Sequence, residues 1–270
     1  MTVAGEFEQD LAAVASSVKR KDVQPGPVDR MLKPLHRWVW SDANRRAAKL
    51  LRFALTEADG GRDIARAAEL TSDALLRRLY LRHALDEQRH ASLFRNRGRA
   101  IYASIAASSG GSGIEANWLS PGERGLDDLK VDKESEGSLL AFLHLSESTA
   151  TRRFALYHQV LDSDPVTREV FDDILGDEAF HMNYTYAQLK RVNPRHHGLQ
   201  LWSARLSRLW KGYLRIAAAI ANVMGGVFLT LQYFVILPLF AFAAKRAAKR
   251  EPVGWHDSRR IGPASLHSQY

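Results

Sequence analysis

Two short motifs in the chain each place a glutamate three residues before a histidine. They pair Glu87 with His90 and Glu178 with His181, and no other of the ten histidines follows a glutamate at this spacing. Residues three apart lie on one face of a helix, so each pair can bind one metal ion. A single such pair is weak evidence, because a solvated helix face can carry the same residues by chance.

The two motifs belong to a longer repeat that includes a second pair of glutamates. Glu57 precedes Glu87 by about 30 positions, and Glu147 precedes Glu178 by about as many, with a turn-forming segment near each midpoint. In an antiparallel helical hairpin, residues equally far from the turn lie side by side. The first half is repeated after about 90 residues, which indicates an internal duplication of one metal-binding hairpin.

These six side chains predict a site for two metal ions. Four carboxylates carry four negative charges, which two divalent cations would neutralise inside an apolar core. The chain has no cysteine, so thiolate ligands and iron–sulfur clusters are excluded. Carboxylate and imidazole ligands suit iron or manganese. The alternative is a structural cluster of buried acids that arginine side chains neutralise.

With these residues, the region 40–192 resembles the ferritin-like carboxylate-bridged di-iron proteins. This group includes ferritins, rubrerythrins, ribonucleotide reductase small subunits, bacterial multicomponent monooxygenases and demethoxyubiquinone hydroxylases. The resemblance implies two iron ions, or manganese beside iron, with O2 as co-substrate. It also implies that Glu57 and Glu147 each bind one ion and that Glu87 and Glu178 bridge both.

Three further residues are candidates for supporting roles at the site. Asp86 and Asp177 each precede a motif glutamate, and in several members of the resembling group an acid here accepts the second ring proton of a ligand histidine. Simple surface acids are the alternative. Tyr184 lies one turn beyond His181, where it could relay electrons or a radical, or pack in the core.

The sequence predicts an all-α fold, with no segment that alternates as a strand does. Apolar residues recur at spacings of three and four in four long stretches, which predict helices over 41–70, 73–106, 137–161 and 165–192. The resemblance implies an antiparallel four-helix bundle, and the long connection 108–137 indicates a crossover between the second and third helices. Gly60 and Gly61 predict a kink or an early end in the first helix.

We expect four regions along the chain. They are an N-terminal helix and linker (1–28), the ferritin-like domain (29–197), an amphipathic and membrane-embedded segment (198–250) and a C-terminal tail (251–270).

The C-terminal part of the chain predicts a membrane attachment. Residues 216–244 contain 29 consecutive uncharged positions, enough for a helix of ~43 Å, longer than the ~30 Å hydrocarbon core of a bilayer. Residues 201–270 hold ten Lys and Arg against two acids, so they carry the whole net charge of +8. A single span and a re-entrant hairpin both remain open, and we expect the metal domain on the cytoplasmic side.

Three functions from different classes fit these features. The first is an O2-dependent oxidase, hydroxylase or desaturase that acts on a membrane lipid or another lipid-soluble substrate and receives electrons from an unidentified donor. The second is a membrane-tethered protein that oxidises iron or reduces peroxide, and the third is a non-catalytic membrane scaffold. Because the basic excess is confined to the tail, we expect no nucleic-acid partner, and a homodimer is compatible with the sequence.

Overall fold

The computed structural model describes residues 23–109 and 131–249, and within these ranges every regular element is a helix. The elements are α2 (Pro27–Met31), α3 (Lys33–Ser41), α4 (Ala43–Leu70), α5 (Ala74–Ser109), α6 (Glu136–Val160), α7 (Pro165–Val192), α8 (His197–Leu231), the π-helical turn η2 (Gln232–Ile236) and α9 (Leu237–Ala248). The all-α prediction is confirmed for this part of the chain. Most of the predicted N-terminal region (1–28) and most of the 108–137 connection lie outside the described residues.

The four predicted long helices correspond to α4, α5, α6 and α7, each within a few residues of the expected bounds. Their starts are set by side-chain caps, because the first backbone N–H groups of a helix have no partner within it. Asp42 accepts from the N–H of Arg45 at 2.8 Å, and Asp164 accepts from the N–H of Thr167 at 3.0 Å. Asp73 caps α5 in the same way, so the short 71–73 turn ends one helix and starts the next.

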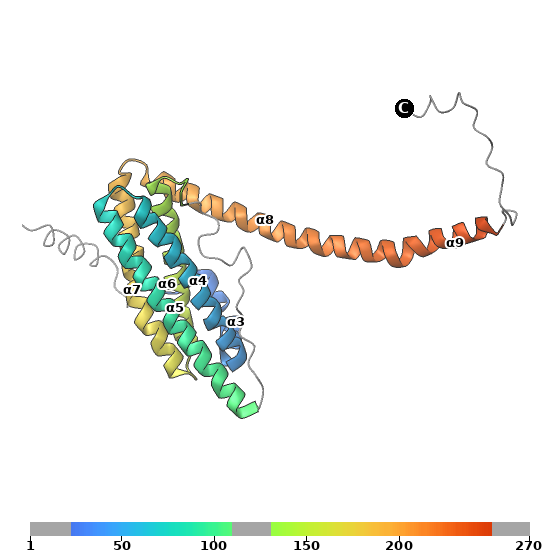
Figure 1. Cartoon of the computed structure of the whole chain (residues 1–270), viewed down its shortest axis with the longest axis horizontal. Coiled ribbons are helices and arrows are strands. Elements are labelled where there is room, and N and C mark those ends of the chain that lie inside the picture. The colour runs from blue at the N-terminus through green and yellow to red at the C-terminus, as the bar shows by residue number, and fades with distance from the viewer. Residues whose placement is uncertain (1–22, 110–130, 250–270) are drawn as a thin grey trace, which may run out of the picture. The chain divides into compact units, whose positions relative to one another are not determined.

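Helix α4 packs along α5, α6 packs along α7, and α5 contacts α7 (Figure 1). The early helix end expected at the double glycine is wrong, because α4 continues unbroken to Leu70. The reason is that Gly61 is a point of close approach. A Cβ there would lie 3.0 Å from Cβ of Glu87 and 3.2 Å from the carbonyl oxygen of Ala84, whereas a Cβ at Gly60 would meet nothing within 4 Å.

Two apolar clusters, each with members from α4, α5, α6 and α7, form the core. One contains Ile64, Leu79, Leu140 and Tyr184, and the other contains Leu50, Phe94, Phe154 and Phe171. The glutamate ligands and His90 fall in sequence between the residues of the two clusters, and His181 directly follows Phe180 at the edge of the first cluster. A polar layer therefore lies between two apolar ones, and both clusters shield it from water.

The chain divides into two compact units, one ending at Arg208 and the other beginning at Leu209. In the first unit, the start of α8 is held by Leu201, which joins the apolar core, and by Arg208, which donates to the carbonyl oxygen of Phe142 at 3.2 Å and to Oγ of Ser146. The residues from 198 to 208 thus group with the helical domain, eleven positions beyond the expected boundary at 197.

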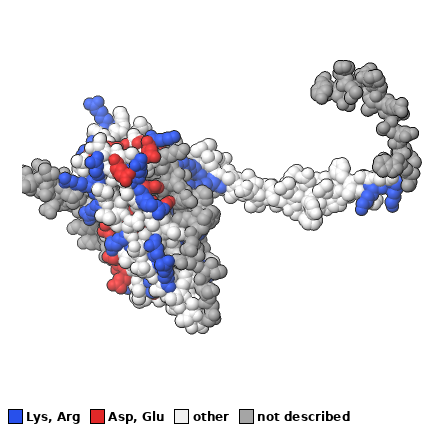
Figure 2. Space-filling view, viewed as in Figure 1, with Lys and Arg blue, Asp and Glu red and all other residues white. Residues whose placement is uncertain are grey.

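In the second unit, α8, η2 and α9 follow one another without reversing direction (Figure 1). Among the described residues, His197–Ala248 is one helical stretch that is long and apolar enough to cross a membrane, and none of its most apolar window is buried. The large apolar side chains from Ile216 to Phe242 are 38% to 70% exposed. Figure 2 shows the part after residue 215 free of charged side chains up to the basic residues that begin at Lys245.

Regular α-helix gives way to a π-helical turn just before Pro238. Proline has no backbone N–H, so the helix must accommodate one missing hydrogen bond there. It does so with a wider turn, in which the N–H of Leu237 donates to the carbonyl oxygen of Gln232.

Candidate metal centre

The six side chains singled out in the sequence come together in the polar layer, and a seventh joins them. Their ligand atoms form two groups, in each of which all four atoms lie within 4.8 Å of one another. The groups are His83, Glu87, Glu147 and His181, and Glu57, Glu87, His90 and Glu178. Glu87 belongs to both groups, which is the position that a bridging carboxylate needs.

Burial of the site is nearly complete. His83, His90 and His181 are 0% exposed, Glu178 is 1% exposed, and Glu57 alone is half-buried. Side chains of Glu57 and Glu87 contact each other, as do those of Glu147 and Glu178, so like charges meet in pairs. A cluster of acids this dry is stable only when protons or cations neutralise it.

Three buried polar atoms at the site make no hydrogen bond within the described part of the chain. They are Nδ1 of His90, Nδ1 of His181 and Oε2 of Glu178. The Nδ1 atom of His90 lies 3.4 Å from Oε1 of Glu178, and Nδ1 of His181 lies 3.6 Å from Oε1 of Glu87. Buried donors and acceptors almost always have a partner, so these three atoms call for one. A metal ion in the centre of the cluster would be such a partner. The residues present fit a pair of metal ions.

The two aspartates hold the outer ring nitrogens of the motif histidines, and each does so across helices. Nε2 of His181 on α7 lies 3.2 Å from Oδ2 of Asp86 on α5, and Nε2 of His90 on α5 lies 3.2 Å from Oδ2 of Asp177 on α7. A proton on Nε2 leaves the lone pair on Nδ1, the atom that faces the cluster. The arrangement agrees with the predicted role of both aspartates.

Tyr184 is fully buried, and its hydroxyl lies 2.7 Å from Nδ1 of His83. Nε2 of His83 lies 3.0 Å from Oε1 of Glu87 and 3.6 Å from Oε1 of Glu147. Tyr184 therefore packs in the core, and His83 links its hydroxyl to the carboxylates. Whether it relays electrons stays a prediction.

Burial dominates the protonation of the site in the absence of metal. It raises the pKa of Glu57, and it raises those of Glu87 and Glu147 well above their usual value, with further increases from the neighbouring carboxylates. Burial also lowers the pKa of His83 to about 3 and that of His181 well below its ordinary value, so both rings are neutral. Neutral imidazole is the form that binds metal.

His90 behaves differently because of its partner. Burial alone would lower its pKa, but the hydrogen bond with Asp177 and the neighbouring Glu178 raise it to about 9. The pKa of Asp177 is lowered by His90 and Arg89, although burial opposes this. A cation in the cluster would displace the proton from Nδ1 of His90 and take over its attraction to Glu178.

His83 was not among the residues predicted from the sequence. The signal was present, because His83 lies four residues before Glu87 and seven before His90, which places all three on one face of α5. A histidine that precedes a glutamate by four positions lies outside the Glu-x-x-His pattern, although it shares the same helix face.

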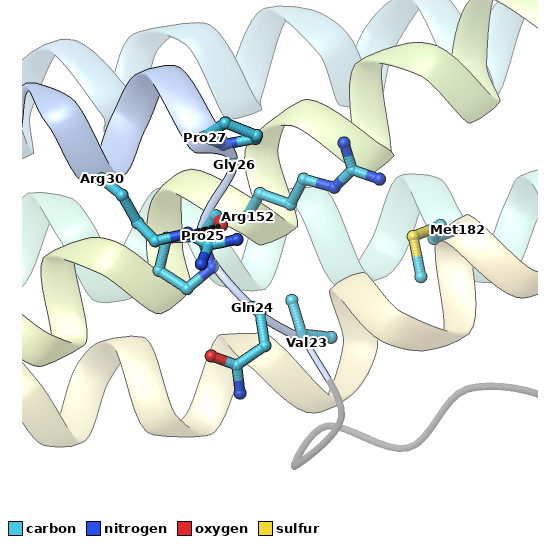
Figure 3. Close-up of a pocket in the computed structure, with 8 residues that line it drawn as sticks. All are labelled: Val23, Gln24, Pro25, Gly26, Pro27, Arg30, Arg152 and Met182. Atoms are coloured by element: carbon cyan, nitrogen blue, oxygen red, sulfur yellow. Dashed lines mark hydrogen bonds between the residues drawn. The ribbon is translucent and has the colours of Figure 1, made fainter.

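A pocket of about 420 Å³ lies between the segment that leads into α2 and the helices α6 and α7 (Figure 3). Its lining residues are Val23, Gln24, Pro25, Gly26, Pro27, Arg30, Arg152 and Met182. Met182 directly follows His181, so one wall of the pocket is a single residue away from a candidate ligand. None of the candidate ligands lines it.

Comparisons with family models, curated proteins and solved structures give no match for this chain. The case for a metal centre therefore depends on the residues and their geometry.

Proposed function

We propose that the chain is a membrane-associated di-iron protein, in which a ferritin-like four-helix bundle of α4, α5, α6 and α7 catalyses an O2-dependent oxidation of a lipid-soluble substrate. The observation that carries the proposal is the buried layer of four carboxylates and three imidazoles, in which the inward nitrogens of two histidines have no hydrogen-bond partner among the described residues. Bound iron would supply the activation of O2 that these side chains cannot perform themselves.

The four helices supply the ligands in a pattern that supports a bundle of this kind. One glutamate comes from α4 (Glu57) and one from α6 (Glu147), while α5 and α7 each supply a glutamate and a histidine three residues later. This distribution is the one found in carboxylate-bridged di-iron bundles. The two apolar clusters on either side of the site would exclude bulk water during the reaction.

The exposed apolar helix favours a lipid-soluble substrate over a water-soluble one. A contiguous apolar surface of the size seen from Ile216 to Phe242 is not stable in water, and no described part of the chain covers it. A bilayer would cover it, and the basic residues at both ends suit anionic headgroups. The site would then act next to a reservoir of lipids.

Each type of oxidation requires a fixed number of electrons and protons besides O2. Hydroxylation inserts one oxygen atom of O2 into a C–H bond, and two electrons and two protons reduce the other oxygen to water. Desaturation removes two hydrogens from adjacent carbons and reduces both oxygens to water with the same two electrons and two protons. Either reaction needs an external electron donor. An iron-oxidising protein needs neither the donor nor an organic substrate.

The test is anaerobic loading of the full-length protein in detergent with Fe(II), followed by O2 in the presence of extracted membrane lipids and a chemical reductant. Mössbauer spectra should show two coupled iron ions, and mass spectrometry should show a lipid that gains one oxygen or loses two hydrogens. Glu87→Ala and His181→Ala should abolish both signals, and Glu69→Ala, an exposed position, should leave them unchanged.

Two results would contradict the proposal in different ways. Rapid O2-dependent oxidation of Fe(II) with no change in any lipid would favour iron handling over lipid oxidation. Unchanged metal content in both Glu87→Ala and His181→Ala would rule out the metal centre itself.

A further inference from the structure

His83 is the one member of the two ligand groups that lies outside the repeat found in the sequence. Its ring is 0% exposed and stacks on the ring of His181, with centroids 3.7 Å apart and planes 27° from parallel. A histidine buried this deeply is held in place by its neighbours on all sides. What its two ring nitrogens contact therefore decides what it can do.

The Nδ1 side of the ring is anchored by a group that serves either tautomer. A tyrosine hydroxyl both donates and accepts hydrogen bonds, so Tyr184 at 2.7 Å can donate to a bare Nδ1 or accept from a protonated one. When Tyr184 accepts, the lone pair lies on Nε2. Ligand histidines are usually fixed in just this way, through a hydrogen bond from the ring nitrogen that does not bind the metal.

The Nε2 side of the ring points at carboxylate oxygens. Nε2 lies 3.0 Å from Oε1 of Glu87 and 3.6 Å from Oε1 of Glu147, and a histidine ring has no other polar atom to offer. Without His83, the first group of ligand atoms would have three members and the second would have four. With it, each group has four.

We propose, on the basis of the metal centre inferred above, that His83 is a third histidine ligand and that the two metal positions are chemically unequal. One position has His83 and His181 with Glu87 and Glu147, and the other has His90 with Glu57, Glu87 and Glu178. The first has two nitrogen donors and the second has one. Tyr184 is the positioning residue of the first.

The inequality has a consequence for metal loading. Nitrogen donors raise the preference of a site for the later divalent metals, and carboxylates favour the earlier, harder ones. The two positions should therefore fill with different affinities, and a mixture of manganese and cobalt should distribute unevenly between them. In a symmetric site, neither metal would prefer one position over the other.

The test uses Co(II), a high-spin probe that shifts the proton resonances of its ligands. The full-length protein in detergent, labelled with ¹⁵N-histidine and stripped of metal, is titrated with Co(II) under nitrogen. Three exchangeable imidazole N–H resonances should appear far outside the normal range. His83→Gln should show two, with one Co(II) affinity reduced at least ~10-fold, as is typical when a ligand or its support is lost.

Two variants control this measurement. His144→Gln removes a histidine on α6 that contacts the carbonyl oxygen of Met182 at 3.0 Å and belongs to neither ligand group, so all three resonances should remain. Tyr184→Phe should retain two bound ions and weaken one of them, because only the anchor of His83 is lost. Circular dichroism of each variant shows that it is folded.

Two outcomes would overturn the inference and are distinguishable. If His83→Gln binds two Co(II) ions with unchanged affinities and the wild type shows only two shifted N–H resonances, His83 is a hydrogen-bonding link between Tyr184 and Glu87, and the metal centre stands. If the wild type shows no shifted resonance and binds no Co(II), the metal centre fails together with it.

Discussion

Gly61 and Glu87 lie on different helices, yet a methyl group on Gly61 would lie only 3.0 Å from Cβ of Glu87. The absence of a side chain at Gly61 therefore sets how closely α4 can approach α5 at the level of the candidate ligands.

Gly61→Ala should destabilise the protein by about 1–3 kcal/mol, because the added methyl group also meets the backbone carbonyl of Ala84 at 3.2 Å and neither helix can move alone. It should also weaken metal binding by displacing Glu87. The neighbouring Gly60→Ala is the control. It fills open space on a helix and should stabilise by about 0.5–1 kcal/mol. Urea unfolding of both variants, with and without Co(II), checks this. Equal effects of the two substitutions would contradict the close approach.

Asp177→Asn should lower metal affinity by roughly 10–100-fold, because the amide no longer holds the Nε2 proton of His90 as a carboxylate does. Asp173→Asn is a matched control, since Asp173 accepts from the same Arg89 at 2.8 Å but does not contact His90. Competition with a chromophoric chelator measures both affinities. A similar loss in the two variants would trace the effect to Arg89.

Glu147→Gln should abolish binding of one metal ion and at the same time stabilise the metal-free protein at pH 8, by on the order of 1–3 kcal/mol. The reason is that burial holds the pKa of Glu147 well above its unfolded value. A raised folded pKa means that the folded state binds more protons, so the metal-free protein should lose stability as the pH rises above about 4.5. Glutamine removes that dependence at this position.

The comparison for this prediction is Glu69→Gln at an exposed ion pair, which should change stability by less than about 1 kcal/mol. Urea unfolding between pH 5 and pH 8 measures both variants. If the metal-free Glu147→Gln protein is less stable than the wild type at pH 8, the acids are neutralised by something other than protons and metal.

Asp164→Asn should destabilise the protein by about 2–5 kcal/mol, because one buried carboxylate caps α7 and binds two arginines from other helices. It lies 2.8 Å from Nη2 of Arg97 and 2.9 Å from Nε of Arg46. Burial opposes ionisation, but the hydrogen bonds from Thr167 and Arg97 lower the pKa of Asp164 below its usual value. Its stabilising contribution is therefore complete above about pH 4 and is lost as the pH falls further.

Thermal melts from pH 3 to pH 7 check this prediction. Asp162→Asn serves as the control, because Asp162 is 68% exposed and contacts only one arginine, Arg37 at 3.2 Å, among the ion pairs seen. It should shift stability by less than about 1 kcal/mol. An acid limb that is identical in the wild type and Asp164→Asn would show that other groups govern unfolding at low pH.

A chain that ends at Gly212 should remain in solution without detergent and still bind two metal ions. It keeps Arg208, which fastens the start of α8 to α6, and loses the exposed apolar stretch. Ultracentrifugation and metal analysis measure the two properties. Loss of metal from a folded truncated chain would mean that the apolar segment contributes to the site.

The sequence was most informative where spacing alone carries the chemistry. Glu57 and Glu147 were found because a hairpin places residues equidistant from its turn side by side, and that relation holds whatever the side chains pack against. The helix bounds followed from caps such as Asp164 followed by Pro165, whose local hydrogen bonds are independent of the rest of the fold.

What the sequence could not provide depends on contacts between helices. Nothing in the order of residues shows that Asp86 holds His181 across helices, and not His90 on its own helix. The same holds for Gly61, which looked like a helix breaker until the proximity of α5 explained it. The role of His83 depends on Tyr184, which lies 101 positions away.

The wide turn at Gln232–Ile236 has a bearing on how the apolar helix could pair with a neighbour in a bilayer. A π-turn holds one residue more than an α-turn, so every later side chain lies about 100° behind the azimuth that an unbroken α-helix would give it. A stripe of residues that follows one side of α8 therefore ends at this turn, and α9 presents a different side in the same direction. A straight neighbouring span could therefore pack against one stripe of residues either before the turn or after it, but not along the whole apolar helix.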